Sequence, residues 1–168
     1  MGNMAQPEPW LRGTIEGLHP AATHLLYTFE QAREELVQFC SHLTVDELWR
    51  NPCTGVASVG FHLRHIAGSI DRLTTYLRGE QLNEPQLAAL RQEQQPGPGF
   101  DVLMESLEVE FQRTEDVVRS IAPASYQELR VVGRKQLPTT VGGLIVHLSE
   151  HTQRHLGQAI LTSKVGRG

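Results

Sequence analysis

The chain has 168 residues, of which 39% are hydrophobic and 20% charged, as expected for one globular domain with a real core. Its net charge of −4 provides no positive field for phosphates, and no apolar run approaches the ~20 residues of a membrane span. The composition therefore argues against nucleic-acid and membrane partners. Two cysteines and a start without a basic or apolar stretch predict a reduced, cytoplasmic location.

The first helical pattern begins at Pro20, which suits the first turn of a helix because its missing N–H is not needed there. Apolar residues then recur in alternating steps of four and three, the spacing of a bundle seam. The seam comprises Leu25, Phe29, Ala32, Leu36, Phe39 and Leu43. This pattern predicts a long first helix. The stretch from Thr44 to Glu47 predicts a capping box and a short helical turn.

A second helix is expected to begin after Ser58, a favourable N-cap, and to run to about Arg78 before the stop signal Gly79. Its seam repeats the spacing of the first. The seam comprises Val59, Leu63, Ile66, Ile70, Leu73 and Leu77. The polar segment 80–100 follows, and Pro85 within it predicts a short helix.

A third helix is expected to be capped by Asp101 and stopped by Pro123. Its seam comprises Met104, Leu107, Phe111, Thr114, Val118 and Ile121. Residues 124–138 form a second linker with no convincing alternating strand, and a last helix is predicted over about 141–163. These patterns predict an all-α protein, a four-helix bundle.

Histidines interrupt the apolar seam of the last helix. After Leu144 and Leu148 the next seam positions hold His151 and His155, and His147 lies within about 80° of them on the helical wheel. Five polar side chains share this face: His147, His151, Arg154, His155 and Gln158. Buried polar groups are unfavourable unless they are paired or bind something. Two histidines spaced i, i+4 point their imidazoles the same way, as metal ligation in a bundle core requires.

A lone histidine on a seam is more often a hydrogen-bonded core residue than a ligand. The pair on one helix and a further cluster on another, His62 and His65, favour a metal site instead. The third ligand is left open by the helical wheel. His62 lies nearer the centre of the second seam, about 60° away, and His65 lies about 120° away on the flank, which also faces a neighbour in a bundle.

The segment SVGFHLRH, beginning at Ser58, and the segment HTQRHLGQ, beginning at His151, resemble the DinB-like superfamily of metalloenzymes. The resemblance covers about residues 19–163. The superfamily includes four-helix bundles similar to mycothiol-dependent maleylpyruvate isomerase. It implies metal ligands at His65, His151 and His155, and it favours His65 over the wheel. That isomerase branch carries a carboxylate at position 151, so this chain departs from it. We expect an extension over 1–18 and one DinB-like bundle domain over 19–168.

The positions of the histidines along their helix axes predict the topology. His65 lies ~9 Å from the start of its helix, whereas the midpoint of His151 and His155 lies roughly 15 Å from the end of theirs. The three histidines lie at the most similar position along the bundle axis if the second and fourth helices run antiparallel. An up-down-down-up bundle with a long crossover between helices two and three satisfies this condition. The segment 80–100 is long enough, and the resemblance implies the same topology.

Three neutral imidazoles and no thiolate suit a divalent metal ion, with Zn²⁺ the first expectation and Ni²⁺ the second. Three protein ligands leave a coordination position open for a water or a substrate thiolate, whose pKa the metal lowers. His147, Arg154 and Gln158 are candidates for orienting the ligands or the substrate; a salt bridge is the alternative role of Arg154.

The sequence and the resemblance together predict a metal-dependent transferase or hydrolase that acts on a small molecule, with a low-molecular-weight thiol as a partner. The alternatives are a bundle that binds metal without catalysis and a metal-free interaction bundle. A homodimer is compatible with a bundle of this size, although no residue specifies it.

Overall fold

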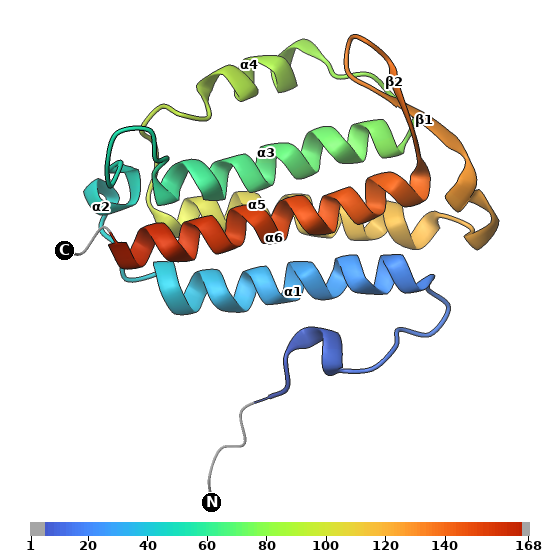
Figure 1. Ribbon diagram of the computed structural model, residues 1–168, viewed down its shortest axis with the longest axis horizontal. Helices are drawn as coiled ribbons and strands as arrows, with labels where there is room; N and C mark the ends of the chain where they lie inside the picture. The colour runs from blue at the N-terminus through green and yellow to red at the C-terminus, as the bar shows by residue number, and fades with distance from the viewer. Residues whose placement is uncertain (1–5, 166–168) are drawn as a thin grey trace, which may run out of the picture.

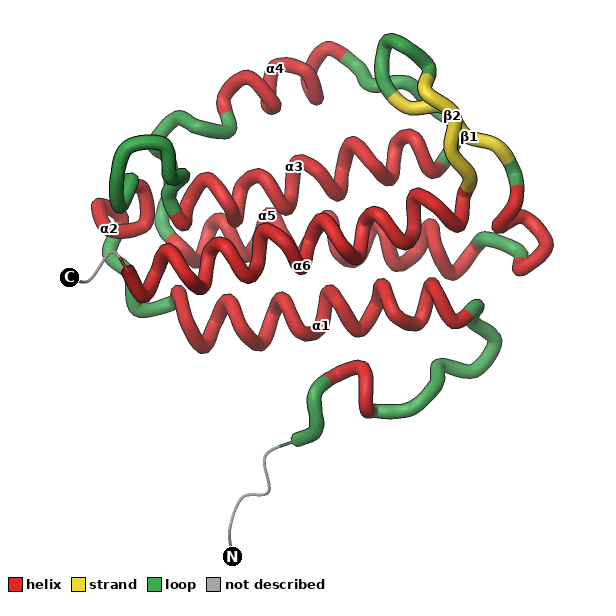
Figure 2. The backbone as a smooth tube through the Cα atoms, in the orientation of Figure 1, coloured by secondary structure: helices red, strands yellow, loops and turns green. Residues whose placement is uncertain are grey.

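The computed structural model describes residues 6–165, and within them four long helices lie side by side (Figure 1). These are α1 (Pro20–Cys40), α3 (Val59–Leu77), α5 (Phe100–Ser120) and α6 (Val141–Val165). The shorter elements are η1 (Pro9–Leu11), α2 (Val45–Trp49), α4 (Glu84–Gln92), η2 (Pro123–Gln127), β1 (Leu129–Val132) and β2 (Leu137–Thr140) (Figure 2). The predicted four-helix bundle is confirmed.

Helices α1 and α6 run in one direction, and α3 and α5 run in the other, so the bundle is up-down-down-up as predicted (Figure 1). Helix α6 packs against α1 and α3, while α5 packs against the same two helices from the other side. The crossover between α3 and α5 carries α4, which lies along the outer side of α3. This arrangement makes α3 and α6 antiparallel neighbours, the pair that carries the histidines.

Most residues of the predicted seams are buried in the core, and the rest pack against it partly buried: Phe39, Leu43, Leu73, Met104 and Ile121. Phe29 of α1 and Phe111 of α5 stack there with ring centroids 4.5 Å apart. The largest fully buried side chains are Phe29, Phe111, Leu25, Leu36, Leu48, Leu63, Ile66, Ile70, Leu77, Leu107, Ile145 and Leu148. Burying such a side chain contributes about 1.5–3 kcal/mol, so these residues dominate the stability of the bundle.

Two predicted helix starts are confirmed in detail. The Ser58 hydroxyl accepts from the backbone N–H of Phe61, and Thr44 and Glu47 form the full capping box of α2. Asp101 is not the cap of α5, because Gly99 holds that position. The helix begins two residues earlier than predicted since Phe100 is buried and joins the core. Asp101 then lies in the first turn, where its carboxylate is favourable for the helix dipole.

The linker 124–138 was expected to lack strands, and this prediction is wrong. It contains part of an antiparallel hairpin in which Leu129 pairs with Thr140. The hairpin escapes pattern analysis because each strand has only four residues. Burial alternates along β1 but not along β2. Arg130 donates from Nε to the carbonyl of Leu77 at 2.8 Å, which fastens the hairpin to the last turn of α3.

No helix among the described residues combines the length and apolar character needed to cross a membrane.

Candidate metal centre

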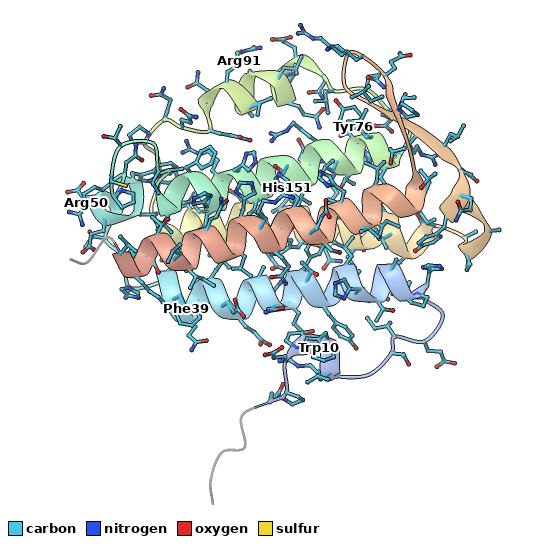
Figure 3. All side chains as sticks on the ribbon, in the orientation of Figure 1. Trp10, Phe39, Arg50, Tyr76, Arg91 and His151 are labelled. Carbon is cyan, nitrogen blue, oxygen red and sulfur yellow. The ribbon has the colours of Figure 1, made fainter. Side chains whose placement is uncertain are left out.

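Three histidines converge across the interface between α3 and α6. One ring nitrogen from each of His65, His151 and His155 lies within 4.8 Å of the others. The ring centroids of His151 and His155 are 4.6 Å apart, as their i, i+4 spacing on α6 requires, and the ring of His65 lies 4.4 Å from that of His155. His151 is labelled between α3 and α6 in Figure 3. The antiparallel packing therefore produces a compact triangle of donors.

The electrostatics of the triangle keep its α6 members neutral. Burial, followed by electrostatic interaction with His65, lowers the pKa of His151 to about 4 and that of His155 to about 3. A cation is bound by the neutral imidazole, so no proton has to be displaced from these two rings at pH 7. Three half-buried nitrogen donors without a thiolate fit a borderline divalent ion such as Zn²⁺.

His62, which the helical wheel favours, lies beside the triangle and contacts only one of its members. Its side chain is buried, and its Nδ1 is 3.1 Å from Nδ1 of His155. Burial and the charge of His65 lower the pKa of His62 to about 4. Both α3 histidines reach α6, but only His65 places a ring nitrogen within 4.8 Å of nitrogens from both His151 and His155. Distance from the centre of the α3 seam therefore does not decide which histidine joins the triangle.

The contact between His62 and His155 restricts where the protons are. If His155 binds a cation, it does so through Nε2, because its Nδ1 is engaged with His62. Its proton then has to be on Nδ1, and His155 donates to Nδ1 of His62. His62 accordingly carries its own proton on Nε2. A neutral His62 is the condition for this arrangement, and its lowered pKa provides it.

His65 is held by a carboxylate that sequence analysis did not select. Its Nδ1 lies 2.6 Å from Oε2 of Glu93, and its Nε2 lies 3.3 Å from the hydroxyl of Ser69. Phe61 stacks on the His65 ring with centroids 5.2 Å apart. Glu93 stands in the polar crossover, where nothing in the sequence distinguishes it from its exposed neighbours. Ser69, in contrast, follows His65 by one helical turn and could have been found by that spacing.

The three residues expected to orient ligands or substrate lie at the margin of the triangle. His147 is half-buried, with its ring 5.5 Å from that of His151 and its Nδ1 2.6 Å from Oε1 of Glu150. Arg154 and Gln158 are exposed. The positive charge of Arg154 contributes to the lowered pKa of His151. None of the three belongs to the ligand group formed within residues 6–165.

Comparison with known proteins identifies the family. The sequence model of the DinB superfamily matches residues 28–159, which is most of the chain. The chain belongs to the DinB superfamily. A similar fold is seen in a solved structure, that of YfiT from Bacillus subtilis, described as "a probable metal-dependent hydrolase with an unusual four-helix bundle topology". That structure has a TM-score of 0.65 at 14% sequence identity, with 90% of this chain and 91% of that chain covered.

The similarity to YfiT shows that the two chains share a four-helix bundle fold. A search of curated proteins gave no match. The histidine triangle of this DinB protein therefore has to be interpreted from its own geometry.

Proposed function

We propose that this DinB protein is a metal-dependent enzyme, a hydrolase or a thiol-dependent transferase acting on a small molecule. The observation that carries the proposal is the convergence of nitrogen atoms from His65, His151 and His155 within 4.8 Å. The description of YfiT as a probable metal-dependent hydrolase supports the same class of chemistry. We infer Zn²⁺ as the metal, with Ni²⁺ as the second choice.

The donor set favours a catalytic ion over a structural one. Structural zinc sites are closed by four protein ligands, whereas catalytic sites use three and leave a position open. Two nearby groups that could supply a fourth ligand are held elsewhere. Both oxygens of Glu93 are engaged, by His65 and Arg72, and His147 is bonded to Glu150. A substrate or a water can therefore approach the ion.

A divalent cation bound here supplies a Lewis acid that lowers the pKa of a water or a thiol. The residues of the chain hold and shield that ion. His65, His151 and His155 bind it, and Phe61 covers one face of the His65 ring. Phe61 also lines a cavity of about 250 Å³ formed with Asn51, Gly55, Val56, Ala57, Ser58 and Gln94. No ionisable carboxylate or basic side chain lines that cavity, which fits a small neutral substrate.

The test begins with protein purified without a His-tag or a nickel column, so that the metal content is native. Elemental analysis and zinc titration after chelation are expected to give one ion per chain. Activity is then assayed with an activated ester, and with an electrophile plus a low-molecular-weight thiol. We expect the activity found in one assay to disappear on chelation and to return with Zn²⁺.

The H65A/H151A double variant is the control, because it removes two ligands from different helices. Protein that binds no metal would overturn the proposal in favour of a metal-free interaction bundle. Binding of one ion without activity in either assay would favour a metal-binding bundle that is not an enzyme.

A further inference from the structure

A closed ring of polar contacts surrounds His65. Its Nδ1 meets Oε2 of Glu93 at 2.6 Å, and Oε1 of Glu93 accepts from Nη1 of Arg72 at 2.7 Å. Nη2 of Arg72 donates to Oγ of Ser69 at 3.3 Å, and that oxygen lies 3.3 Å from Nε2 of His65. The contacts thus form a closed cycle of four side chains that begins and ends at the imidazole of His65.

The chemistry of the members fixes the direction of every contact in this ring. Arg72 can only donate, and a carboxylate can only accept. Nδ1 of His65 faces a carboxylate oxygen, so it must donate, and the neutral ring then carries its proton on Nδ1 and its lone pair on Nε2. In the metal-free protein the hydroxyl of Ser69, which accepts from Arg72, can donate to this lone pair, and it would turn away from Nε2 when a cation binds there. A lone pair on Nε2 is what a metal ligand needs, so the ring selects the ligating tautomer.

Glu93 is brought to this position by the docking of the crossover. It follows α4, and the backbone carbonyls of Gln92 and Gln95 on either side of it accept from Arg64 of α3. The Arg64 guanidinium stacks on Trp49, whose Nε1 donates to the carbonyl of Pro98. The segment is therefore pinned on both sides of Glu93.

The burial of this ion pair shows that its geometry is specified. Glu93 is 4% exposed and Arg72 is 9% exposed. Two charges at this depth are favourable only with good geometry and further hydrogen bonds, which His65 and Ser69 supply.

Gly68 gives an independent sign that α3 is shaped around Glu93. A Cβ atom at position 68 would lie 2.6 Å from Oε1 of Glu93 and 2.8 Å from Nη1 of Arg72. Glycine inside a helix is destabilising by roughly 1 kcal/mol relative to alanine. Here the missing side chain leaves the space that the carboxylate occupies.

We infer that Glu93 is a positioning residue, which fixes the ring orientation and the tautomer of His65 for metal binding. The inference deepens the proposed function and rests on the metal site proposed there. Glu93 does not ligate the ion itself, because both of its oxygens are already engaged. The crossover thereby contributes a residue to a centre whose ligands all come from α3 and α6.

The principal variant is E93Q. The amide has one acceptor oxygen where the carboxylate offers two, so it cannot serve both His65 and Arg72. We expect the Kd for Zn²⁺ to rise 10–100-fold. A second variant, G68A, keeps Glu93 but displaces its carboxylate, and it is expected to weaken zinc binding in the same direction. The matched control is Q86A, because Gln86 docks α4 through Asp71 and Thr75 without touching a histidine.

A second readout needs no metal. Nitrogen-15 NMR of the metal-free protein at pH 8 reports which nitrogen of His65 carries the proton. We expect Nδ1–H in the wild type and in Q86A, with a shift toward Nε2–H in E93Q and G68A. This measurement separates the two proposals: a wild type that fails to bind zinc overturns the proposed function, while the tautomer still tests Glu93.

Two results would overturn the role of Glu93. One is a wild-type His65 that carries its proton on Nε2. The other is zinc affinity that falls as much in Q86A as in E93Q, which would reduce Glu93 to a docking contact.

Discussion

Nδ1 of His62 lies 3.1 Å from Nδ1 of His155, across the interface between α3 and α6. This contact leaves Nε2 of His155 as the nitrogen that can bind a cation. The Nδ1 of His65 is engaged in the same way by Glu93. Two of the three candidate ligands are therefore oriented by a partner on the side away from the ion, one by an imidazole and the other by a carboxylate.

Replacing His62 by alanine is expected to weaken zinc binding without abolishing it. His155 would lose the acceptor that orients its ring, and loss of such a partner typically costs 10–100-fold in metal affinity. The Kd for Zn²⁺, measured by competition with a chromophoric chelator, checks this expectation. The exposed His42 provides the control, since H42A should leave the Kd unchanged. If H62A abolished binding as completely as H155A, His62 would itself be a ligand.

Removing any one of His65, His151 and His155 is expected to raise the Kd for Zn²⁺ by at least ~100-fold, because a three-ligand site has no spare donor. H147A should change the Kd by no more than about threefold, since His147 is bonded to Glu150 outside the triangle. Isothermal titration calorimetry on the metal-free proteins gives both values. An H147A variant as defective as H151A would contradict the assignment of the ligands.

Zinc is expected to stabilise the folded chain through linkage. An ion that binds the native state at 100 times its Kd adds about 2.7 kcal/mol to the free energy of unfolding. For a domain of this size that gain corresponds to a rise in Tm of about 5–10 °C. Differential scanning calorimetry with and without a chelator measures the rise. The H65A/H151A double variant should show no dependence of Tm on zinc.

The metal-free protein is expected to lose stability as the pH falls from about 6.5 to about 4. Burial lowers the pKa of His62 and His151 to about 4 and that of His155 to about 3. Between these values and the ordinary pKa of ~6.5, the unfolded chain binds protons that the folded chain does not. The contribution of these three histidines to the free energy of unfolding is therefore fully present above pH ~6.5, and it declines as the pH is lowered.

Urea denaturation at pH 7, 5.5 and 4.5 in the presence of a chelator measures this decline. Replacing His155 by asparagine should make the slope of the unfolding free energy against pH shallower. A pH profile unchanged by that substitution would show that His155 is not the group responsible.

The aromatic core is predicted to support the bundle independently of the metal. Phe111 is fully buried and stacks on Phe29, so F111A is expected to reduce the free energy of unfolding by about 3–5 kcal/mol. Phe111 belongs to α5, which packs against α1 and α3. Helix α5 contributes none of the three candidate ligands. The Kd for zinc of the folded variant should match that of the wild type. Chemical denaturation and zinc titration test the two halves of this prediction.

The amino-acid sequence by itself determined the helices and the pair on α6. Seams such as that from Leu25 to Leu36 depend on local spacing, and the same spacing puts His151 and His155 on one face. Helix caps at Ser58 and Thr44 are local for the same reason. The topology was also accessible, because the heights of the histidines and the length of the crossover constrain how the helices can run.

Periodicity left open which α3 histidine joins the pair, although the family resemblance favoured His65, and only the tertiary structure decided what holds that residue. The wheel ranks His62 above His65 because it measures distance from a seam, whereas both residues contact α6 and only His65 converges with His151 and His155. Glu93 lies 28 residues from His65 and reaches it only when the crossover docks on α3. Burial and pairing of such a charge arise from contacts between segments distant in the chain, so they cannot be predicted from periodicity within one segment.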